Sequence, residues 1–295
     1  MSASATMVKR QDTTPGRRAW RALLYALVFF LGAVFMFPFF WTISSSLKAT
    51  HELYLWPPPI LPETPIWDNY AEVFRLFPFG TWVINTIMVC FLATTGSVLS
   101  ATVVAYSFAR FRYPGRDLLF MITLGTMMIP TEVTLIPQFL IFKELDWLNT
   151  IRPLWIPHWF GGGAFNIFLL RQFIQTIPRE LDQAALIDGA GRLRILFAIV
   201  MPLIKPALAT ALVISLIWNW SDFLGPLVYL NSSSKYTLAL GLRFFDEWGR
   251  STGQGLPQDH YLMAACVMSS TPILVLFFST QRYFVQGIVM TGIKG

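Results

Sequence analysis

Long apolar runs separated by short polar segments make up most of the chain. A hydrocarbon core about 30 Å thick needs about 20 apolar residues for one helix to cross it, and several of the runs reach that length. Membrane-spanning strands would instead give segments of about ten residues with alternating polarity, which we do not find. The pattern therefore predicts an all-α, polytopic membrane protein with six transmembrane helices, at residues 20–43, 82–109, 118–142, 155–170, 206–230 and 261–284.

Proline residues interrupt the third and fourth of these runs, at Pro130, Pro137, Pro153 and Pro157. Proline removes a backbone donor, and membrane helices tolerate it where neighbouring groups satisfy the freed carbonyl. We therefore expect these two spans to be the least regular, with a local break in the helix at Pro130.

Charged residues are scarce, at 13% of the chain against 55% hydrophobic residues. Soluble domains carry about 25% charged residues, so this chain lacks the polar surface to cover itself in water. The only two cysteines, Cys90 and Cys266, fall inside predicted spans. We interpret them as small apolar packing residues rather than as a disulfide or metal ligands.

The basic residues are distributed unevenly between the two sides of the membrane. With the N-terminus inside, the inner segments carry 15 of the 22 Lys and Arg residues. The positive-inside rule then predicts that both termini are cytoplasmic. The same residues are divided among several short loops, so the net charge of +6 does not indicate a nucleic-acid partner.

No segment predicts a separate soluble domain, so the chain is expected to hold a cytoplasmic tail at residues 1–20 and one transmembrane permease domain at 21–295. The first apolar run is longer than the 7 to 15 residues usual in a signal peptide, which favours an uncleaved anchor. The outer loop from Ser44 to Thr81 contains several prolines and is expected to pack as an extended cover.

A short helix is predicted between spans four and five, in a cytoplasmic loop at about residues 176–204. Pro178 can begin this helix, Glu180 and Asp182 suit its first turn, and Gly189 can end it. Three- and four-residue spacing places Leu181, Ala184, Ala185 and Asp188 on one face. The residues alone allow two interpretations, a docking element for another protein or a helix that lies on lipid.

The same loop resembles the EAA loop of binding-protein-dependent ABC importers. The matching residues are Ala184-Ala185, Asp188-Gly189-Ala190, Ile199 and Pro202, while Gln183 replaces the usual first Glu and Met201 the usual Leu. Four further segments resemble the carbohydrate branch of that family, in the expected order: Pro130-Thr131-Glu132 with Pro137, Trp218-Asn219-Trp220-Ser221-Asp222-Phe223, Gln281-Arg282-Tyr283-Phe284-Val285-Gln286-Gly287 and Gly292-Ile293-Lys294-Gly295. The resemblance to a maltose-type permease subunit covers nearly the whole chain after residue 20.

This resemblance implies a function and a set of partners. It implies import of a sugar through a multi-pass protein of the bacterial inner membrane. The expected partners are a second homologous permease in a heterodimer, a cytoplasmic ATPase dimer and an extracytoplasmic solute-binding protein. The helix of the loop would dock on the ATPase through Glu180, Gln183, Ala184, Ala185, Asp188 and Gly189. A structural alternative is that Asp188-Gly189 is only a turn and Ala184-Ala185 only packs between helices.

Polar residues inside the predicted spans are candidates for a translocation path. A charge at mid-bilayer costs about 2.5 to 3.5 kcal/mol on the insertion scale, so such residues indicate a function. Glu132 and Asp222 are the clearest cases, with Asn219 and Trp220 beside the latter and His158 and Asn166 as weaker candidates. Their alternative role is hydrogen bonding between helices, which we favour for Glu132, and packing for Trp220.

The chain has no G-x-x-x-x-G-K-[ST] phosphate loop, and Gly161-Gly162-Gly163 lacks the adjoining Lys. We therefore interpret that triplet as a helix break or a point of close packing. No cluster of metal ligands is evident, so no metal or cofactor is expected in this chain, and ATP is expected to bind a partner. The chain would then not be an enzyme itself. The main alternative is a self-sufficient secondary transporter or channel using the buried acids, and a membrane-embedded enzyme is the third.

Overall fold

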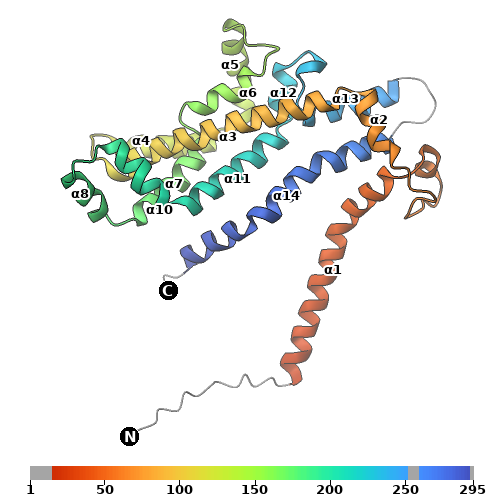
Figure 1. The fold of residues 1–295 in the computed structure, drawn as a ribbon, viewed down its shortest axis with the longest axis horizontal. Coiled ribbons are helices and arrows are strands. Elements are labelled where there is room, and N and C mark those ends of the chain that lie inside the picture. Colours follow the sequence, from red (N-terminus) through yellow and green to blue (C-terminus); the bar gives the residue numbers. More distant parts are fainter. Residues whose placement is uncertain (1–14, 252–258, 293–295) are drawn as a thin grey trace.

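The computed structural model describes residues 15–251 and 259–292, and within these ranges the chain is built of helices with no strand. Most of the helices lie in one elongated bundle, drawn in Figure 1 with α2 and α13 near one end and α8 near the other. We refer to these as the α2 end and the α8 end. Residues 1–14, most of the predicted tail, and residues 293–295 of the C-terminal motif lie outside the described residues.

The central element of the bundle is α3 (Phe79–Arg110), a continuous helix of 32 residues. It packs against α7 (Ala164–Thr176) and α11 (Lys205–Ser221) along much of its length. Its inward face is lined with small residues at three- and four-residue spacing, namely Ala93, Gly96, Ser97, Ala101 and Ala105. Small side chains let membrane helices approach closely, which explains the position of α3 at the centre.

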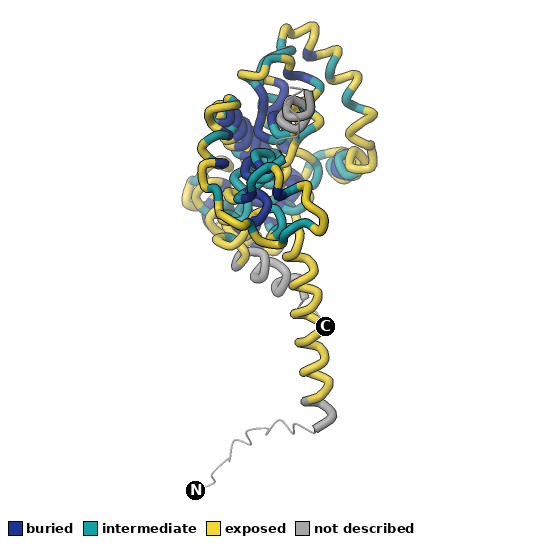
Figure 2. Tube along the Cα trace, turned by 90° about the vertical axis from the view of Figure 1, so that its right-hand side faces the viewer, coloured by how far each residue is buried: buried dark blue, intermediate teal, exposed yellow. Residues whose placement is uncertain are grey.

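The first and last long helices, α1 (Pro15–Ser46) and α14 (Asp259–Gly292), pack against each other at the edge of the bundle. From there α1 diverges from the body of the molecule, as Figures 1 and 2 show. None of the residues in its most apolar stretch is buried, whereas half of the corresponding stretch of α3 is. The apolar surface of α1 is therefore available to lipid or to another subunit.

Two apolar helical stretches are bent at a break, one inside the predicted third span and one just before the predicted fifth. The third is divided into α4 (Arg116–Gly125), η2 (Thr126–Met128) and α5 (Thr131–Glu144), with a bend of 99°. The break falls at Ile129–Pro130, as the sequence predicts. A second bend of 83° separates α11 from the helical segment before it, which comprises α9 (Arg192–Ile195), η4 (Leu196–Val200, a π-helix) and α10 (Met201–Leu203).

The all-α membrane fold is confirmed, whereas the count of six spans and the cytoplasmic position of both termini stay predictions. Three described helices are long and apolar enough to cross a membrane, or up to five if each bent pair forms one span. The predicted fourth span at 155–170 is instead α6 (Arg152–Trp155), η3 (Ile156–Trp159), a glycine break and then α7. The predicted fifth span ends early, because Asp222 lies between α11 and the short α12 (Leu224–Tyr229).

The two long loops of the chain meet at the α2 end. They contain η1 (Thr50–Tyr54), α2 (Asp68–Leu76), η5 (Ser233–Lys235) and α13 (Leu238–Ser251). Lys48 is fully buried there, and its Nζ donates to the carbonyl of Pro59 at 2.6 Å. Burial lowers the pKa of Lys48, and the neighbouring Glu52 carboxylate opposes that shift. These contacts attach the proline-rich segment to the end of α1, in agreement with the predicted cover.

Candidate functional site

The predicted loop helix is present as α8 (Glu180–Ile187), at the end of the bundle opposite the two long loops. Its last turn is closed by two backbone hydrogen bonds, from Gly189 N to Leu186 O at 3.1 Å and from Ala190 N to Ala185 O at 2.9 Å. These bonds form a Schellman motif, which requires a left-handed residue after the helix. Gly189 provides it with φ of 80°. The helix therefore begins two residues after Pro178 and ends at the predicted glycine.

The two faces of α8 have different surroundings. Asp182 and Ala185 are buried, and Ala185 belongs to the main apolar core. The other residues of the predicted docking set are exposed, namely Glu180, Gln183, Ala184, Asp188 and Gly189. The predicted common face of Ala184 and Ala185 is therefore divided, because Ala185 is buried in the apolar core and Ala184 is exposed.

Apolar side chains are exposed on and beside α8. Ile187 is 86% exposed, and Leu181 and Leu193 are also exposed. They lie outside the long apolar helices and next to the charged side chains of Glu180, Arg192 and Arg194, which are exposed as well. A mixed surface of this kind, with a small residue at its centre, suits close contact with another protein.

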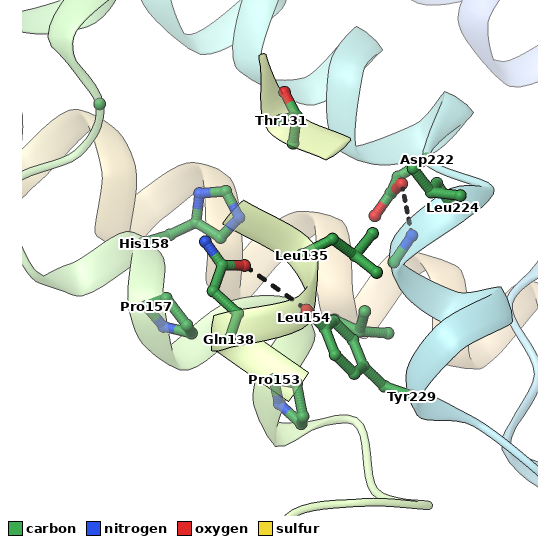
Figure 3. Close-up of a pocket in the computed structure, with 12 residues that line it drawn as sticks. Thr131, Leu135, Gln138, Pro153, Leu154, Pro157, His158, Asp222, Leu224 and Tyr229 are labelled. Atoms are coloured by element: carbon green, nitrogen blue, oxygen red, sulfur yellow. Dashed lines mark hydrogen bonds between the residues drawn. The ribbon is translucent and has the colours of Figure 1, made fainter. Parts of the chain in front are cut away.

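A cavity of about 370 Å³ lies where α5, α6, η3 and α12 meet. Figure 3 shows its polar side chains directed toward the space between the helices. The polar members of its lining are Thr131, Gln138, His158, Asp222 and Tyr229, and Leu135, Pro153, Leu154, Pro157 and Leu224 contribute most of the apolar part. Tyr229 donates its hydroxyl to Gln138 Oε1 at 3.4 Å, across the space between α12 and α5.

Asp222 occupies the turn between α11 and α12. Its Oδ1 accepts a hydrogen bond from Gly225 N at 3.2 Å, so the carboxylate caps the short α12. A Cβ on Gly225 would lie 2.7 Å from Asp222 Oδ2. The absence of a side chain at Gly225 thus lets the Asp222 carboxylate fold back onto the start of α12. The same carboxylate also lines the cavity.

A smaller cavity of about 130 Å³ is lined by residues of α3, η3, α7 and α11. Asn166 stands in its wall and donates to Ser97 Oγ and to Ser215 Oγ, both at 2.9 Å. Asn219 donates to Thr94 Oγ1 at 3.3 Å one turn further along. His158 and Gly163 line both cavities, so the two adjoin each other. We call the polar side chains of the two linings the polar line, which comprises Thr131, Gln138, His158, Asp222, Tyr229, Ser97, Asn166, Ser215 and Asn219.

The glycine triplet makes this line possible. Gly161, Gly162 and Gly163 all have positive φ, at 98°, 67° and 82°. A Cβ on Gly162 would lie 2.0 Å from the backbone oxygen of Ser97 and 2.7 Å from Ala101 Cβ, so the segment approaches α3 more closely than any side chain would allow. The triplet is both a helix break and a point of close packing, as interpreted from the sequence.

The structure brings together only part of the predicted path. Asp222 lines the larger cavity and Asn219 the smaller one, whereas Glu132 and Trp220 line neither. Glu132 is exposed in the first turn of α5. Trp220 donates its Nε1 to Ser269 O of α14 at 3.2 Å, which is a packing contact. Five further lining residues were not predicted from the sequence, namely Thr131, Gln138, Tyr229, Ser97 and Ser215. Only Thr131 had a local signal, its place directly after the break at Pro130.

Known proteins resemble the chain in sequence and in fold. Residues 98–290 match the family model described as binding-protein-dependent transport system inner membrane component. The sn-glycerol-3-phosphate transport system permease protein UgpE of Pectobacterium atrosepticum is 30% identical over 260 residues, which is 86% of this chain and 90% of that protein. The arabinooligosaccharides transport system permease protein AraQ of Halalkalibacterium halodurans is 32% identical over 269 residues, 90% of this chain and 94% of that protein.

A solved structure shares the fold over nearly the whole chain. It is the crystal structure of a bacterial ABC transporter involved in the import of the acidic polysaccharide alginate. The matching chain has a TM-score of 0.81 and 25% sequence identity, with 92% of this chain and 98% of that chain covered.

Proposed function

Because the chain belongs to the family of binding-protein-dependent transport system inner membrane components, we propose that it forms part of the path by which a carbohydrate enters a bacterial cell. The chain is a transmembrane permease subunit of an ABC importer, and ATP hydrolysis takes place in a separate ATPase subunit. We extend this to cofactors and place the bound ATP on that partner alone. The bacterial inner membrane is the proposed location.

The observation that carries the proposal is the polar line formed by the two cavities. Hydroxyl and amide groups of Thr131, Gln138 and Tyr229 face one cavity, and Asn166 and Asn219 face the other. Such groups exchange hydrogen bonds with sugar hydroxyls and replace the water that a sugar loses on entering the membrane. Apolar side chains between them suit the C–H faces of a sugar ring.

The charges of the lining favour an uncharged substrate. Among the residues that line the two cavities there is no Lys or Arg, and the one carboxylate belongs to Asp222. A fixed negative charge without a cation repels a phosphate or a uronate. We therefore propose a neutral sugar for this chain, although relatives include permeases named for sn-glycerol 3-phosphate and for arabinooligosaccharides.

The partners follow from two exposed surfaces. We propose that the outward face of α8 docks on the cytoplasmic ATPase, which places the α8 end on the inner side of the membrane. The larger cavity is open on one side, since Thr131, Gln138 and Asp222 are exposed in this chain. A second, homologous permease in a heterodimer would close it and cover part of the apolar surface of α1. An extracytoplasmic binding protein would deliver the sugar to the α2 end.

The test is a gentle-detergent pull-down of the tagged full chain from its native cells, with mass spectrometry of the recovered proteins. We expect an ATPase, a second permease and a solute-binding protein. Ala184→Trp, on the exposed face of α8, should lose the ATPase and keep the second permease, because the ring obstructs docking without disturbing the core. The matched control is Thr176→Trp, an exposed residue just before α8. Recovery of the chain alone under conditions that preserve transport would contradict the proposal.

The bound sugar provides a separate test. Mass spectrometry of the ligand released from the recovered binding protein should find a molecule without phosphate or carboxylate. An anionic ligand that the assembled importer transports would contradict the neutral substrate and leave the importer assignment intact.

A further inference from the structure

A buried ion pair joins α8 to the end of α3. Arg110 is the last residue of α3, and Asp182 lies in the first turn of α8. Arg110 Nε lies 3.0 Å from Asp182 Oδ2, and the two side chains are only 3% and 8% exposed. The pairs Arg75–Glu72 and Arg116–Asp117, by contrast, each lie within one helix.

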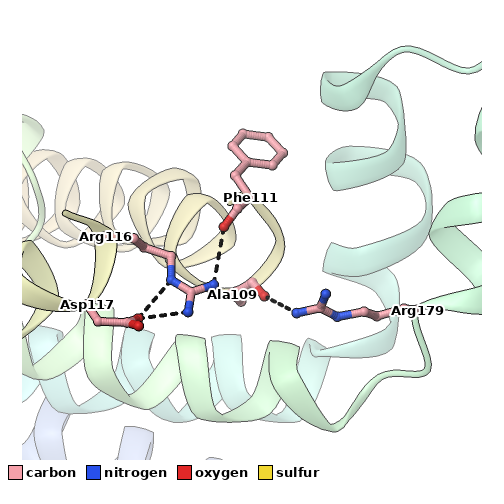
Figure 4. A network of polar contacts seen from close by, with 5 residues as sticks. All are labelled: Ala109, Phe111, Arg116, Asp117 and Arg179. Carbon is pink, nitrogen blue, oxygen red and sulfur yellow. Dashed lines mark hydrogen bonds and ion pairs between the residues drawn. The ribbon is translucent and has the colours of Figure 1, made fainter. Parts of the chain in front are cut away.

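Backbone carbonyls add to this attachment on both sides of Pro178. Arg110 Nη2 donates to Ile177 O at 3.0 Å, just before the proline. Arg179 Nη2 donates to Ala109 O at 3.4 Å, just after it, as Figure 4 shows. Arg110 of α3 thus donates to the segment just before α8, and Arg179 of that segment donates back to α3.

The ion pair fixes an orientation more than it adds stability. Buried ion pairs contribute little to stability compared with apolar residues of similar volume, because both charges lose their hydration. Among the described residues, Arg110 Nε and Asp182 Oδ1 make no hydrogen bond, so the pair acts through charge, and the guanidinium is oriented by its bond to Ile177 O. Moving the carboxylate away from this cation, in a site nearly closed to water, costs free energy. Ala185 and Ile177, in the same segment, belong to the apolar core.

The other end of this attachment reaches the polar line. From Arg110, α3 continues without a break through Ser97 and Thr94, which contact Asn166 and Asn219 at the smaller cavity. The rise of an α-helix puts Ser97 about 20 Å from Arg110 along the axis. A displacement of α8 that is transmitted to Arg110 therefore moves a wall of the cavity.

We propose that the Arg110–Asp182 pair is a positioning link that transmits movement of α8 to α3, and through α3 to the polar line. The proposal rests on the proposed docking of α8 on the ATPase. The pair contacts neither the sugar nor the ATPase, and it holds α8 at a fixed position and orientation on α3. Without the ion pair α8 still docks on the ATPase. Its movement then displaces α8 relative to the end of α3 and does not reach the cavities.

The test compares two matched carboxylate variants in the importer recovered from native membranes. Asp182→Asn keeps the size of the side chain and removes the buried charge. Asp117→Asn does the same to the exposed pair within α4, whose Asp117 side chain is 73% exposed. We expect Asp182→Asn to retain the ATPase and its hydrolysis, and to lower uptake per ATP at least tenfold. Asp117→Asn should leave that ratio within twofold of the native value.

A distance measurement reports on the link itself. Spin labels at Ile84→Cys on α3 and Ile187→Cys on α8, both exposed positions, are introduced after Cys90 and Cys266 are replaced by Ala. Their separation should stay narrowly distributed in the native pair and in Asp117→Asn, with and without ATP, and should broaden in Asp182→Asn. A narrow distribution and native uptake per ATP in Asp182→Asn would overturn the proposal.

Two controls separate other kinds of failure. If Asp182→Asn does not insert, the double variant Arg110→Met/Asp182→Leu removes both charges without leaving one buried, and the same criteria then apply to it. Absence of the ATPase from the native preparation would contradict the docking of α8. The distance measurement on the chain itself would still decide whether the pair holds α8 to α3.

Discussion

At the scale of single residues, glycines decide where the backbone can approach or turn. Gly162 lies against α3 with no room for a Cβ, and Gly189 closes α8 in a left-handed conformation. Gly162 is required for a close approach and Gly189 for a positive φ, so each glycine is needed for one fixed geometry. The two sites therefore give different predictions.

Gly162→Ala is expected to separate η3 and α7 from α3 and to disrupt the polar line. The added methyl group would meet the backbone at Ser97, and overpacking of this kind costs about 1 to 3 kcal/mol. We expect a lower unfolding temperature and reduced uptake. The control is Gly32→Ala in α1, where a Cβ meets nothing within 4 Å, and it should change neither quantity. Equal behaviour of the two variants would contradict the close packing.

Substitutions of Gly189 should affect coupling more than folding. An alanine in the left-handed region costs about 1 to 2 kcal/mol, so Gly189→Ala should be tolerated with weakened activity. Gly189→Pro also loses the hydrogen bond to Leu186 O and cannot adopt the positive φ. It should leave the chain in the membrane and uncouple ATP hydrolysis from uptake, which reconstituted vesicles can measure. Normal uptake and stimulated hydrolysis in Gly189→Pro would show that the end of α8 has no part in coupling.

Asp222 has two separable roles, one as the cap of α12 and one as a charge at the larger cavity. Asp222→Asn preserves the cap, because an amide oxygen accepts the same bond from Gly225 N. Asp222→Ala removes both, at a cost of about 1 kcal/mol for the cap. We expect each variant to lower the uptake rate more than the amount of protein in the membrane. Asp222→Ala should reduce the uptake rate and the amount of protein further than Asp222→Asn does. Native uptake by Asp222→Asn would restrict the residue to its structural role.

At the scale of elements, the helices and breaks that the sequence predicts correctly are those whose signal is local. The apolar run at 82–109 matches α3 within three residues at the start and one at the end, and the break at Pro130 appears where a missing donor requires it. Gly189 ends α8 for a reason that lies within six residues of chain. These features depend on neighbours in sequence, so the sequence alone predicts them.

Elements whose form depends on distant contacts were not predictable. The residues from 155 to 170 have the composition of a span, but η3 and α7 fold back on α3 because the glycine triplet allows a contact with Ser97. Which face of α8 is buried depends on Arg110, more than seventy residues away in sequence. Gln138 and Tyr229 come together at the larger cavity only after α5 and α12 have packed.

At the scale of the whole molecule, the exposed apolar surface of α1 predicts that the isolated chain is less stable than the assembled importer. Ligands and subunits that bind only the folded state raise its apparent stability by mass action. Unfolding can be followed with a thiol-reactive dye in a Cys266→Ala variant, since Cys90 is buried in α3 and becomes accessible as the bundle opens. We expect a higher unfolding temperature with the second permease bound. An unchanged temperature would indicate that lipid alone covers α1.

The pairing of α1 with α14 has a consequence for how the protein is made. More than two hundred residues separate the end of α1 from the start of α14, and the most apolar stretch of α1 has no buried residue. Its neighbour α14 follows all the other described helices in the chain, so the ribosome makes it long after α1. The helix must therefore remain in lipid, or beside the insertion machinery, while the rest of the bundle forms. Among the described helices, the first to be made is thus one of the last to reach its neighbour.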